Sequence, residues 1–215
     1  PDAYPPLVTG EEERPVIDVE LLRAVADELG VSLSINRIPA IGRDFNPRNW
    51  GLTRAHCQVI AGGVVDAPIT RSFLQTGPTY AETGWAALAP EATEIAGRDV
   101  GVLVLVSGLD RIALSQYLRS READARIVGQ AAELEAAVAE GAVAAGITEA
   151  LLARQIAARN GWESWFLPGD LPRHYITLGL WKGDLTLKRA VMHAFDDLRE
   201  DGTVAAILES YLGEG

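Results

Sequence analysis

The residues with the clearest chemical potential lie in the stretch 57–85, where an apolar run opens into a glycine-rich loop. The run meets the pair Gly62 and Gly63, and a polar turn then ends at Thr70 and Arg71. A buried strand followed by such a loop commonly presents backbone N–H groups and one fixed cation to an anion. The segment therefore predicts an anion site, with Gly63, Thr70 and Arg71 as candidate contacts.

Cysteine and histidine chemistry is not expected. The single cysteine, Cys57, excludes an internal disulfide, and its place on an apolar strand indicates a small packing residue. The three histidines, His56, His174 and His193, show no ligand spacing with cysteine or carboxylates. Neither a metal site nor a cofactor is therefore predicted.

Composition narrows the class of partner. With 215 residues, the chain can form one large domain or two lobes of about 100 residues each. Its formal net charge of −11 repels a phosphate backbone, so nucleic acid is not an expected partner. No apolar stretch is long enough for a transmembrane helix. Pro1 resembles a start inside a domain, which is compatible with a targeting sequence that has been removed.

Strands and helices alternate along most of the chain. The strands are expected at residues 31–36, 57–63, 84–89, 99–106, 125–129, 142–148, 163–167 and 174–181. The helices are expected at residues 18–29, 110–119, 131–141, 149–159, 185–199 and 202–212. This alternation predicts an α/β protein with largely parallel sheets.

Several short motifs occur in an order that resembles a known family. They are Tyr4-Pro5-Pro6, Val16-Ile17-Asp18, the strand 57–63 with Thr70-Arg71, Gly77-Pro78-Thr79-Tyr80, the strand and turn 100–108, the segment 143–149, YITLGLWKGD at 175–184, and 198–203 with its Asp-Gly-Thr turn. Their order, over nearly the whole chain, resembles the extracellular solute-binding proteins of ABC transporters. The similarity is to the amino-acid-binding group, family 3, with the type II periplasmic binding protein fold.

The resemblance implies a two-lobed α/β fold with mostly parallel sheets flanked by helices and two crossing hinge strands. Lobe 1 would comprise residues 1–84 and 180–215, and lobe 2 residues 90–174. The hinge strands would be residues 84–88 and 175–179, about which the lobes close on a ligand. The family also begins with a strand just before the Tyr-Pro-Pro turn, so lobe 1 is expected to lack a central strand.

The function implied is binding rather than catalysis. The protein would capture a small carboxylate-bearing ligand, an amino acid or a related compound, and hand it to an ABC transporter permease. It would be a monomer in the periplasm or outside the cell, either free or lipid-anchored.

Arg71 is the first candidate contact, because family members use an arginine after this strand to bind the ligand carboxylate in a bidentate pair. The alternative is a surface arginine paired with Asp66 or Glu82. The family pattern is Thr-x-x-Arg, whereas here Thr70 and Arg71 are adjacent and the preceding loop is longer. Asp66, within that longer loop, could recognise a polar ligand or cap a turn.

Two further positions correspond to lobe 2 contacts of the family. Ser107 and Gly108 lie at a strand-to-helix turn, where free N–H groups favour an anion, or where Ser107 caps the helix with Asp110 in a capping box. Glu149 occupies the position of an aspartate that binds the ligand ammonium. As a residue at a helix N-terminus, it could also simply stabilise that helix.

Aromatic contacts are expected from Tyr4 and Trp50, which correspond to family positions that stack on the ligand. The alternatives are packing against the first helix for Tyr4 and core filling for Trp50. The remaining tryptophans, including Trp165, are expected in the core or hinge.

Two other functions are compatible with the same pattern. The fold also hosts cyclohexadienyl dehydratases, in which Glu149 could act as a general acid, although no lysine accompanies it in the binding loop. The chain could instead be a sensing or partner-binding module, such as a receptor ectodomain or the periplasmic partner of a redox enzyme. A transmembrane helix beyond Gly215 would indicate a receptor.

Overall fold

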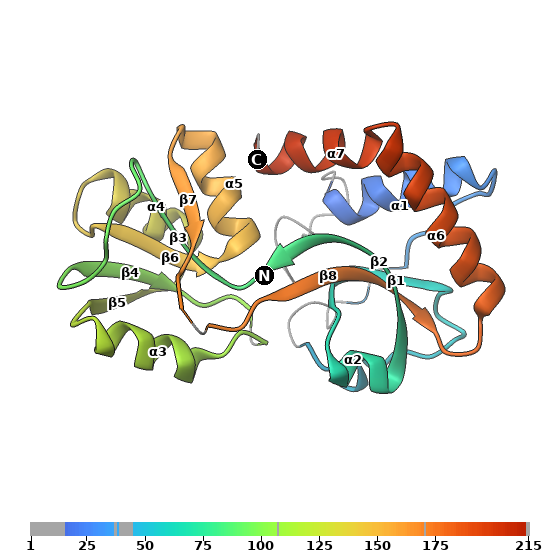
Figure 1. The fold of residues 1–215 in the computed structure, drawn as a ribbon, viewed down its shortest axis with the longest axis horizontal. Coiled ribbons are helices and arrows are strands. Elements are labelled where there is room, and N and C mark those ends of the chain that lie inside the picture. Colours follow the sequence, from blue (N-terminus) through green and yellow to red (C-terminus); the bar gives the residue numbers. More distant parts are fainter. Residues whose placement is uncertain (1–15, 37, 39–44, 107, 170, 214–215) are drawn as a thin grey trace. The chain divides into compact units, whose positions relative to one another are not determined.

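The computed structural model describes residues 16–36, 38, 45–106, 108–169 and 171–213. The chain divides into two compact units (Figure 1). Unit 1 combines Pro1–Ala81 with His174–Tyr211, and unit 2 combines Glu82–Arg173 with Leu212–Gly215. Unit 2 is thus almost continuous in sequence, whereas unit 1 is assembled from two distant stretches.

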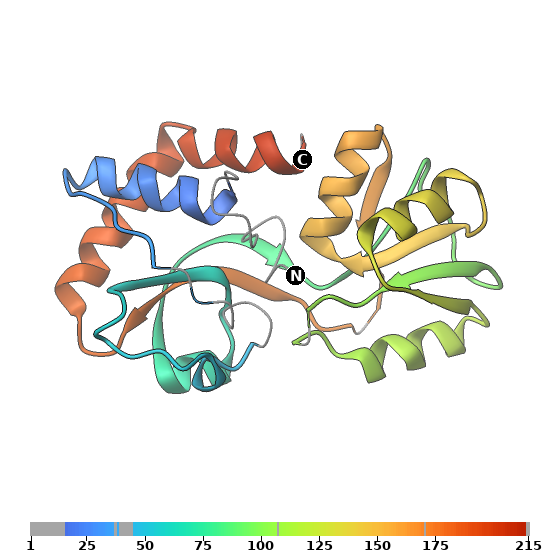
Figure 2. The ribbon, with the colours of Figure 1, turned by 180° about the vertical axis from the view of Figure 1, so that it is seen from behind.

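Unit 2 is a five-stranded sheet with helices on both faces. Its strands are β3 (Trp85–Ala89), β4 (Asp99–Leu103), β5 (Asp124–Val128), β6 (Ala145–Glu149) and β7 (Glu163–Phe166), in the order β5-β4-β6-β3-β7. Its helices are α3 (Arg111–Ser120), α4 (Ala131–Ala139) and α5 (Ala150–Asn160). Figures 1 and 2 show α3 on one face of the sheet, with α4 and α5 on the other.

The sheets are mixed, so the prediction of mostly parallel sheets is wrong. In unit 2, β4 runs parallel to β5 and β6, but β3 runs antiparallel to both β6 and β7. The crossover β6-α5-β7 leaves room for one strand between β6 and β7, and β3 fills it in the opposite direction. Continuous apolar runs indicate burial on both faces but do not encode strand direction.

Two glycines let α4 approach the sheet of unit 2 closely. Gly101 on β4 pairs with Gly146 on β6, and both lie beneath Leu134 of α4. Leu134 is completely buried in the core cluster that α4 and α5 share with the sheet. The absence of two side chains therefore makes the space that this leucine fills.

Unit 1 contains a three-stranded sheet with β8 at its centre. Its strands are β1 (Val59–Val65), β2 (Leu74–Thr83) and β8 (His174–Trp181), in the order β1-β8-β2. Its helices are α1 (Ile17–Glu28), the 3₁₀ turn η1 (Pro47–Trp50), α2 (Pro68–Phe73), α6 (Leu185–Glu200) and α7 (Thr203–Leu212). β8 is antiparallel to β1, so both sheets of the chain contain antiparallel pairs.

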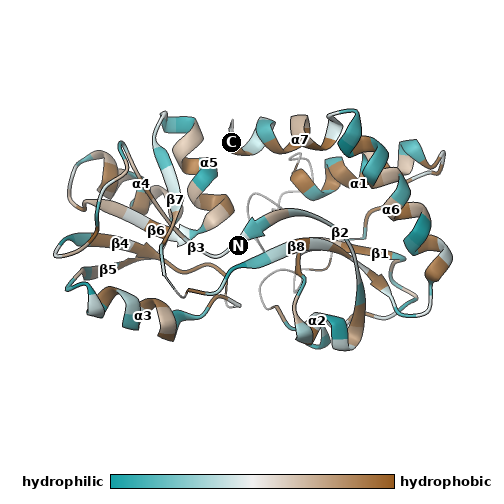
Figure 3. Ribbon diagram, in the orientation of Figure 1, coloured by the Kyte–Doolittle hydropathy of each residue, from teal (hydrophilic) through white to brown (hydrophobic). Residues whose placement is uncertain are grey.

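The helices of unit 1 follow from ordinary amphipathic and capping signals. α6 buries Val191, Ala194, Phe195 and Leu198, a helical spacing that gives the helix one hydrophobic face (Figure 3). α1 begins and ends within one residue of the prediction, and Gly30 beyond it has a φ of 64°, as a C-terminal cap requires. No helix in the described residues is long and apolar enough to cross a bilayer.

Three predicted local structures differ from those found. Residues 31–36 form no strand, and Val31, Leu33 and Ile35 are exposed, because an alternating pattern makes a strand only where a partner pairs with its backbone. The polar turn before Arg71 is in fact the helix α2, which begins with a proline at its first position. The cap of α3 is Asp110, not Ser107, since the helix begins at Arg111.

Candidate ligand-binding site

The anion that faces the glycine pair is a carboxylate of the chain itself. Asp18, in the first turn of α1, is almost completely buried. Its Oδ2 accepts a hydrogen bond from the N–H of Gly62, and its Oδ1 accepts one from the Tyr80 hydroxyl at 2.6 Å. The sequence pattern of an anion site is thus partly explained by an internal contact between β1 and α1.

An irregularity in β1 directs these N–H groups. The pairing of β1 with β8 shifts between Ile60 and Val64. Gly62 and Gly63, within this interval, have φ values of 105° and 86°, in the left-handed region that favours glycine. The glycine pair is therefore needed for the backbone path.

Burial raises the pKa of Asp18 to about 6, although hydrogen bonds from Tyr80, Gly62 and Gly63 act to lower it. The N–H of Gly63 is thus already directed at Asp18. A contact between Gly63 and an external ligand stays a prediction.

The structure brings Arg71 and Asp66 together. Arg71 Nε lies 3.4 Å from Asp66 Oδ1, while Glu82, the other partner considered, lies 4.0 Å from Arg173. The Arg71–Asp66 contact is an ion pair rather than a hydrogen bond, since Asp66 Oδ1 has no hydrogen-bond partner in the described residues. The Arg71 side chain is 56% exposed. Its guanidinium therefore still presents donors to solvent.

Thr70, next to Arg71 on α2, points into the protein instead. It is completely buried, and its Oγ1 has no hydrogen-bond partner within the described part of the chain. Adjacent residues on a helix face different directions, so Thr70 and Arg71 cannot present their side chains side by side as residues three apart would.

Trp50 lies in the core of unit 1. It is buried in a cluster with Leu52, Ile60, Leu74 and Trp181, which is the core-filling role considered as the alternative for this residue. Tyr4 and Ser107, two of the predicted contacts, lie outside the described residues.

Glu149 caps α5 and is buried within unit 2. Its carboxylate accepts hydrogen bonds from the N–H groups of Leu151 and Leu152 at 3.0 Å, and one from the Thr83 hydroxyl. Both carboxylate oxygens are engaged by these contacts. Helix stabilisation is thus evident, while binding of a ligand ammonium by Glu149 stays a prediction.

Gly108 lies in the turn between β4 and α3. The first turn of α3 is capped by Asp110, whose Oδ1 accepts a hydrogen bond from Ala113 N at 2.8 Å. A carboxylate thus already sits at this helix N-terminus, which favours capping over binding of a second anion there. The role of Gly108 as a ligand contact stays a prediction.

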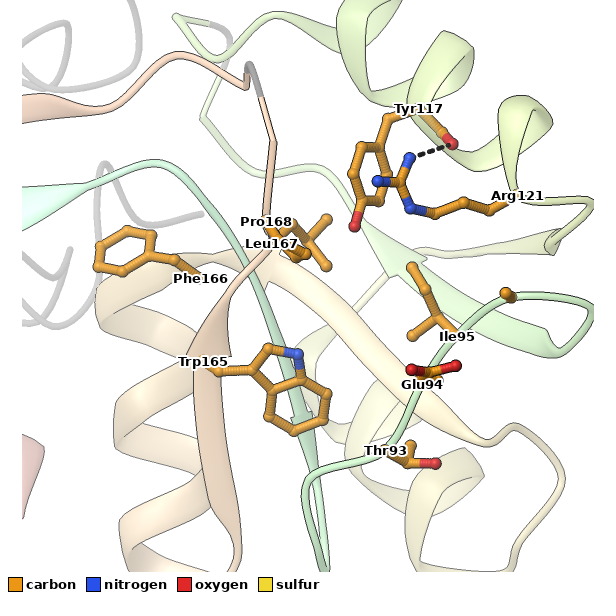
Figure 4. Close-up of a pocket in the computed structure, with 10 residues that line it drawn as sticks. Thr93, Glu94, Ile95, Tyr117, Arg121, Trp165, Phe166, Leu167 and Pro168 are labelled. Carbon is orange, nitrogen blue, oxygen red and sulfur yellow. Dashed lines mark hydrogen bonds between the residues drawn. The ribbon is translucent and has the colours of Figure 1, made fainter.

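Unit 2 contains a pocket that the sequence did not indicate. Its volume is about 390 Å³, and its lining includes Tyr117 and Arg121 of α3 together with Trp165 of β7 (Figure 4). These residues come from separate segments, and Trp165 was expected in the core or hinge. Only the tight i,i+4 spacing of Tyr117 and Arg121 offers a signal in the sequence.

Metal chemistry finds no support in the described residues, which contain no group of three histidines, cysteines or carboxylates placed to hold an ion. The site residues are therefore those of a binding protein for organic groups. The family model for bacterial extracellular solute-binding proteins, family 3, matches residues 1–214. The chain belongs to this family.

Family 3 membership confirms the resemblance found in the motifs and the expectation of a binding protein rather than an enzyme. It also confirms a location outside the cytoplasm, in the periplasm or the extracellular space.

Solved structures of solute-binding proteins share the fold of this family 3 protein. Substrate-binding domain 2 of GlnP from Lactococcus lactis, in an open conformation, has a TM-score of 0.77 and 16% identity over 100% of this chain and 93% of that chain. An ancestral cationic amino acid solute-binding protein, AncCDT-1, has a TM-score of 0.72 and 19% identity over 98% and 93% of the two chains. ArtJ from Geobacillus stearothermophilus has a TM-score of 0.60 and 16% identity over 99% and 93%.

Proposed function

We propose that this protein captures a small carboxylate-bearing solute, an amino acid or a close derivative, and delivers it to an ABC importer. The observation that carries the proposal is the state of Arg71. Its guanidinium is exposed, has one off-line carboxylate neighbour, and makes no side-chain hydrogen bond within the described residues. An arginine in this condition can form a bidentate pair with a carboxylate.

The relatives support an amino acid as the ligand. ArtJ is described as an arginine-, lysine- and histidine-binding protein, and another structure with a TM-score of 0.61 is an ancestral arginine-binding protein bound to glutamine. The permease partner, the monomeric state and the hinge strands 84–88 and 175–179 belong to the same proposal. So does attachment to the membrane by a lipid.

Asp66 sets how strongly Arg71 attracts a ligand. Because the Asp66 carboxylate lies 3.4 Å from Arg71 Nε, it holds the side chain near the end of β1 while leaving the two Nη atoms for the ligand. Asp66 also reduces the positive charge that a ligand meets. A neutral or cationic amino acid, with a single carboxylate, fits this balance better than a dicarboxylate.

A thermal-shift screen tests the proposal. The purified protein would be heated with each amino acid, with its decarboxylated and deaminated analogues, and with small dicarboxylates. A ligand present at 100 times its dissociation constant stabilises the folded state by about 2.7 kcal/mol, which is a shift of several degrees. We expect Arg71→Ala to abolish the shift.

Arg189→Gln is the matched control, because Arg189 is an exposed arginine of unit 1 on α6. The control should respond to the ligand as the unmodified protein does. An unchanged ligand response in Arg71→Ala would contradict the role of Arg71. The absence of any response across the screen would contradict the solute class.

The deaminated analogues decide whether Glu149 binds an ammonium group. Since both Glu149 oxygens accept hydrogen bonds from α5 and Thr83, we expect loss of the amine to weaken binding less than loss of the carboxylate. If the amine proves essential and Glu149→Gln removes the preference for it, Glu149 binds the ammonium group after all.

A further inference from the structure

We propose that unit 2 carries a second binding site, in the pocket beside Trp165, for a small monocarboxylate with an aromatic or branched apolar body. The pocket measures about 390 Å³, within the range of small-molecule sites. Figure 4 shows the indole of Trp165 and the side chains of Tyr117 and Arg121 lining the same space, with Phe166 turned away from it.

Backbone hydrogen bonds hold the walls of this pocket in place. The N–H of Gly97, after the segment that carries Ile95, donates to the carbonyl of Arg121 at 2.9 Å. The N–H of Leu167 donates to the carbonyl of Trp85 at 3.0 Å, and Trp165 is paired with Ala87 in the sheet. The pocket is therefore built from fixed elements of one unit, which lowers the entropy lost on binding.

Arg121 supplies a positioned positive charge. Its guanidinium lies 3.6 Å from the centroid of the Tyr117 ring, and Nη1 donates to the Ser120 hydroxyl at 3.2 Å. Arg121 has no carboxylate partner in the described part of the chain, and its Nε and Nη2 make no hydrogen bond there. A guanidinium stacked on an aromatic ring and lacking a counter-ion is prepared to bind an anion through its open edge.

The neutral polar groups of the pocket are also donors. The Trp165 indole N–H can only donate, and neither it nor the Tyr117 hydroxyl has a hydrogen-bond partner among the described residues. Burial raises the pKa of Tyr117, although Arg121 acts to lower it, so the hydroxyl stays protonated. A ligand must therefore bring acceptor oxygens.

The remaining walls define the rest of the ligand. Ile95 and Leu167 are buried apolar side chains of the pocket, and the Trp165 ring offers a flat apolar face. Glu94, exposed at the pocket, places one negative charge opposite Arg121 and disfavours a second carboxylate on the ligand. These features together select a compact apolar body with one carboxylate.

Titration of the full-length chain with phenylacetate, followed by ¹H–¹⁵N spectra, tests this site. The Trp165 indole resonance is identified by its loss in Trp165→Phe. We expect it to shift saturably with phenylacetate and not with phenethylamine, which has the same ring but a cationic head. Arg121→Gln should weaken binding roughly tenfold or more.

Arg126→Gln, which removes an exposed arginine of β5 outside the pocket, should leave the affinity unchanged. If Arg121→Gln does not fold, Arg121→Lys replaces it, because lysine keeps the charge but loses the planar fork, and weaker binding is again expected. No shift at millimolar phenylacetate, or equal affinity in a folded Arg121 variant, would overturn the proposal. Arg71→Ala should bind phenylacetate normally, so failure of one site is distinguishable from failure of the other.

Discussion

The carboxyl group of Asp18 makes the stability of unit 1 depend on pH. It is buried at the start of α1, where burial raises its pKa from 3.8 to about 6. A carboxyl whose pKa is raised on folding is protonated more readily in the folded state than in the unfolded state. Its contribution to stability is therefore fully present below pH 3.8 and is lost as the pH rises through 6.

We expect Asp18→Asn to remove this dependence. The shift corresponds to roughly 3 kcal/mol of unfolding free energy between acidic and neutral pH. Denaturant unfolding at a series of pH values from 4 to 8 would measure it in both proteins. The difference between the original protein and the variant should fall steadily as the pH rises.

His174 acts in the opposite direction, because burial lowers its pKa and makes neutral pH favourable for the folded state. It is present in both proteins, so its effect cancels in the difference. Parallel stability curves for the two proteins would show that Asp18 does not titrate in this range.

At the scale of elements, the contact between α4 and its sheet depends on two missing side chains. A methyl group at Gly146 would lie 3.0 Å from Leu134 Cγ and 3.2 Å from both of its Cδ atoms. At Gly101 it would meet only one Cδ atom, at 2.8 Å, which is the flexible end of the same side chain. Gly146 is therefore the more sensitive of the two positions.

We expect Gly146→Ala to lower the free energy of unfolding by roughly 1–3 kcal/mol through overpacking. In a double-mutant cycle with Leu134→Ala, the combined loss should be clearly smaller than the sum of the single losses, since the smaller residue at position 134 makes room for the methyl group. Chemical denaturation of the four proteins measures the cycle.

Gly129→Ala provides the control for backbone effects, because a methyl there meets only Glu133 Oε2 at 3.6 Å. It should change stability by much less than Gly146→Ala. Additive losses for Gly146 and Leu134 would show that the two positions do not share one space.

Most elements were predictable because their signals are local. Helix caps and apolar periodicity located α1, α3 to α7, and the strands from β3 onward within a few residues. The strand predicted at 31–36 was wrong, since pairing is a property of the partner as much as of the segment. The direction of β3 was missed for the same reason.

The candidate site was less predictable than the fold. The sequence placed an anion near the glycine pair but could not show that Asp18 supplies it, because the two lie 44 residues apart. It also could not show that Thr70 points inward on a helix while Arg71 points outward. The pocket at Trp165 depends on three separated segments, which no motif connects.

At the scale of the whole molecule, the two units differ in how the chain builds them. Unit 2 is nearly one continuous stretch with its own core cluster, whereas the sheet of unit 1 requires β8 between β1 and β2. We expect a fragment of residues 82–173 to fold and unfold cooperatively, and a fragment of residues 1–81 not to do so.

Far-UV circular dichroism and thermal unfolding of the two fragments measure this difference. Fragment 82–173 loses the hydrogen bonds from Arg154 to the carbonyls of Leu212 and Gly213, at 3.1 and 2.9 Å, so its melting temperature should lie below that of the full chain. A disordered fragment 82–173, or a folded fragment 1–81, would contradict the expectation.

The central position of β8 also sets an order of events during synthesis. Residues 174–181 leave the ribosome after four-fifths of the chain, and until then β1 and β2 have no strand between them. The first lobe to be translated is thus the last to be completed. For a protein that must leave the cytoplasm, this delay keeps a long N-terminal stretch threadable through an export channel while the nascent chain is still growing.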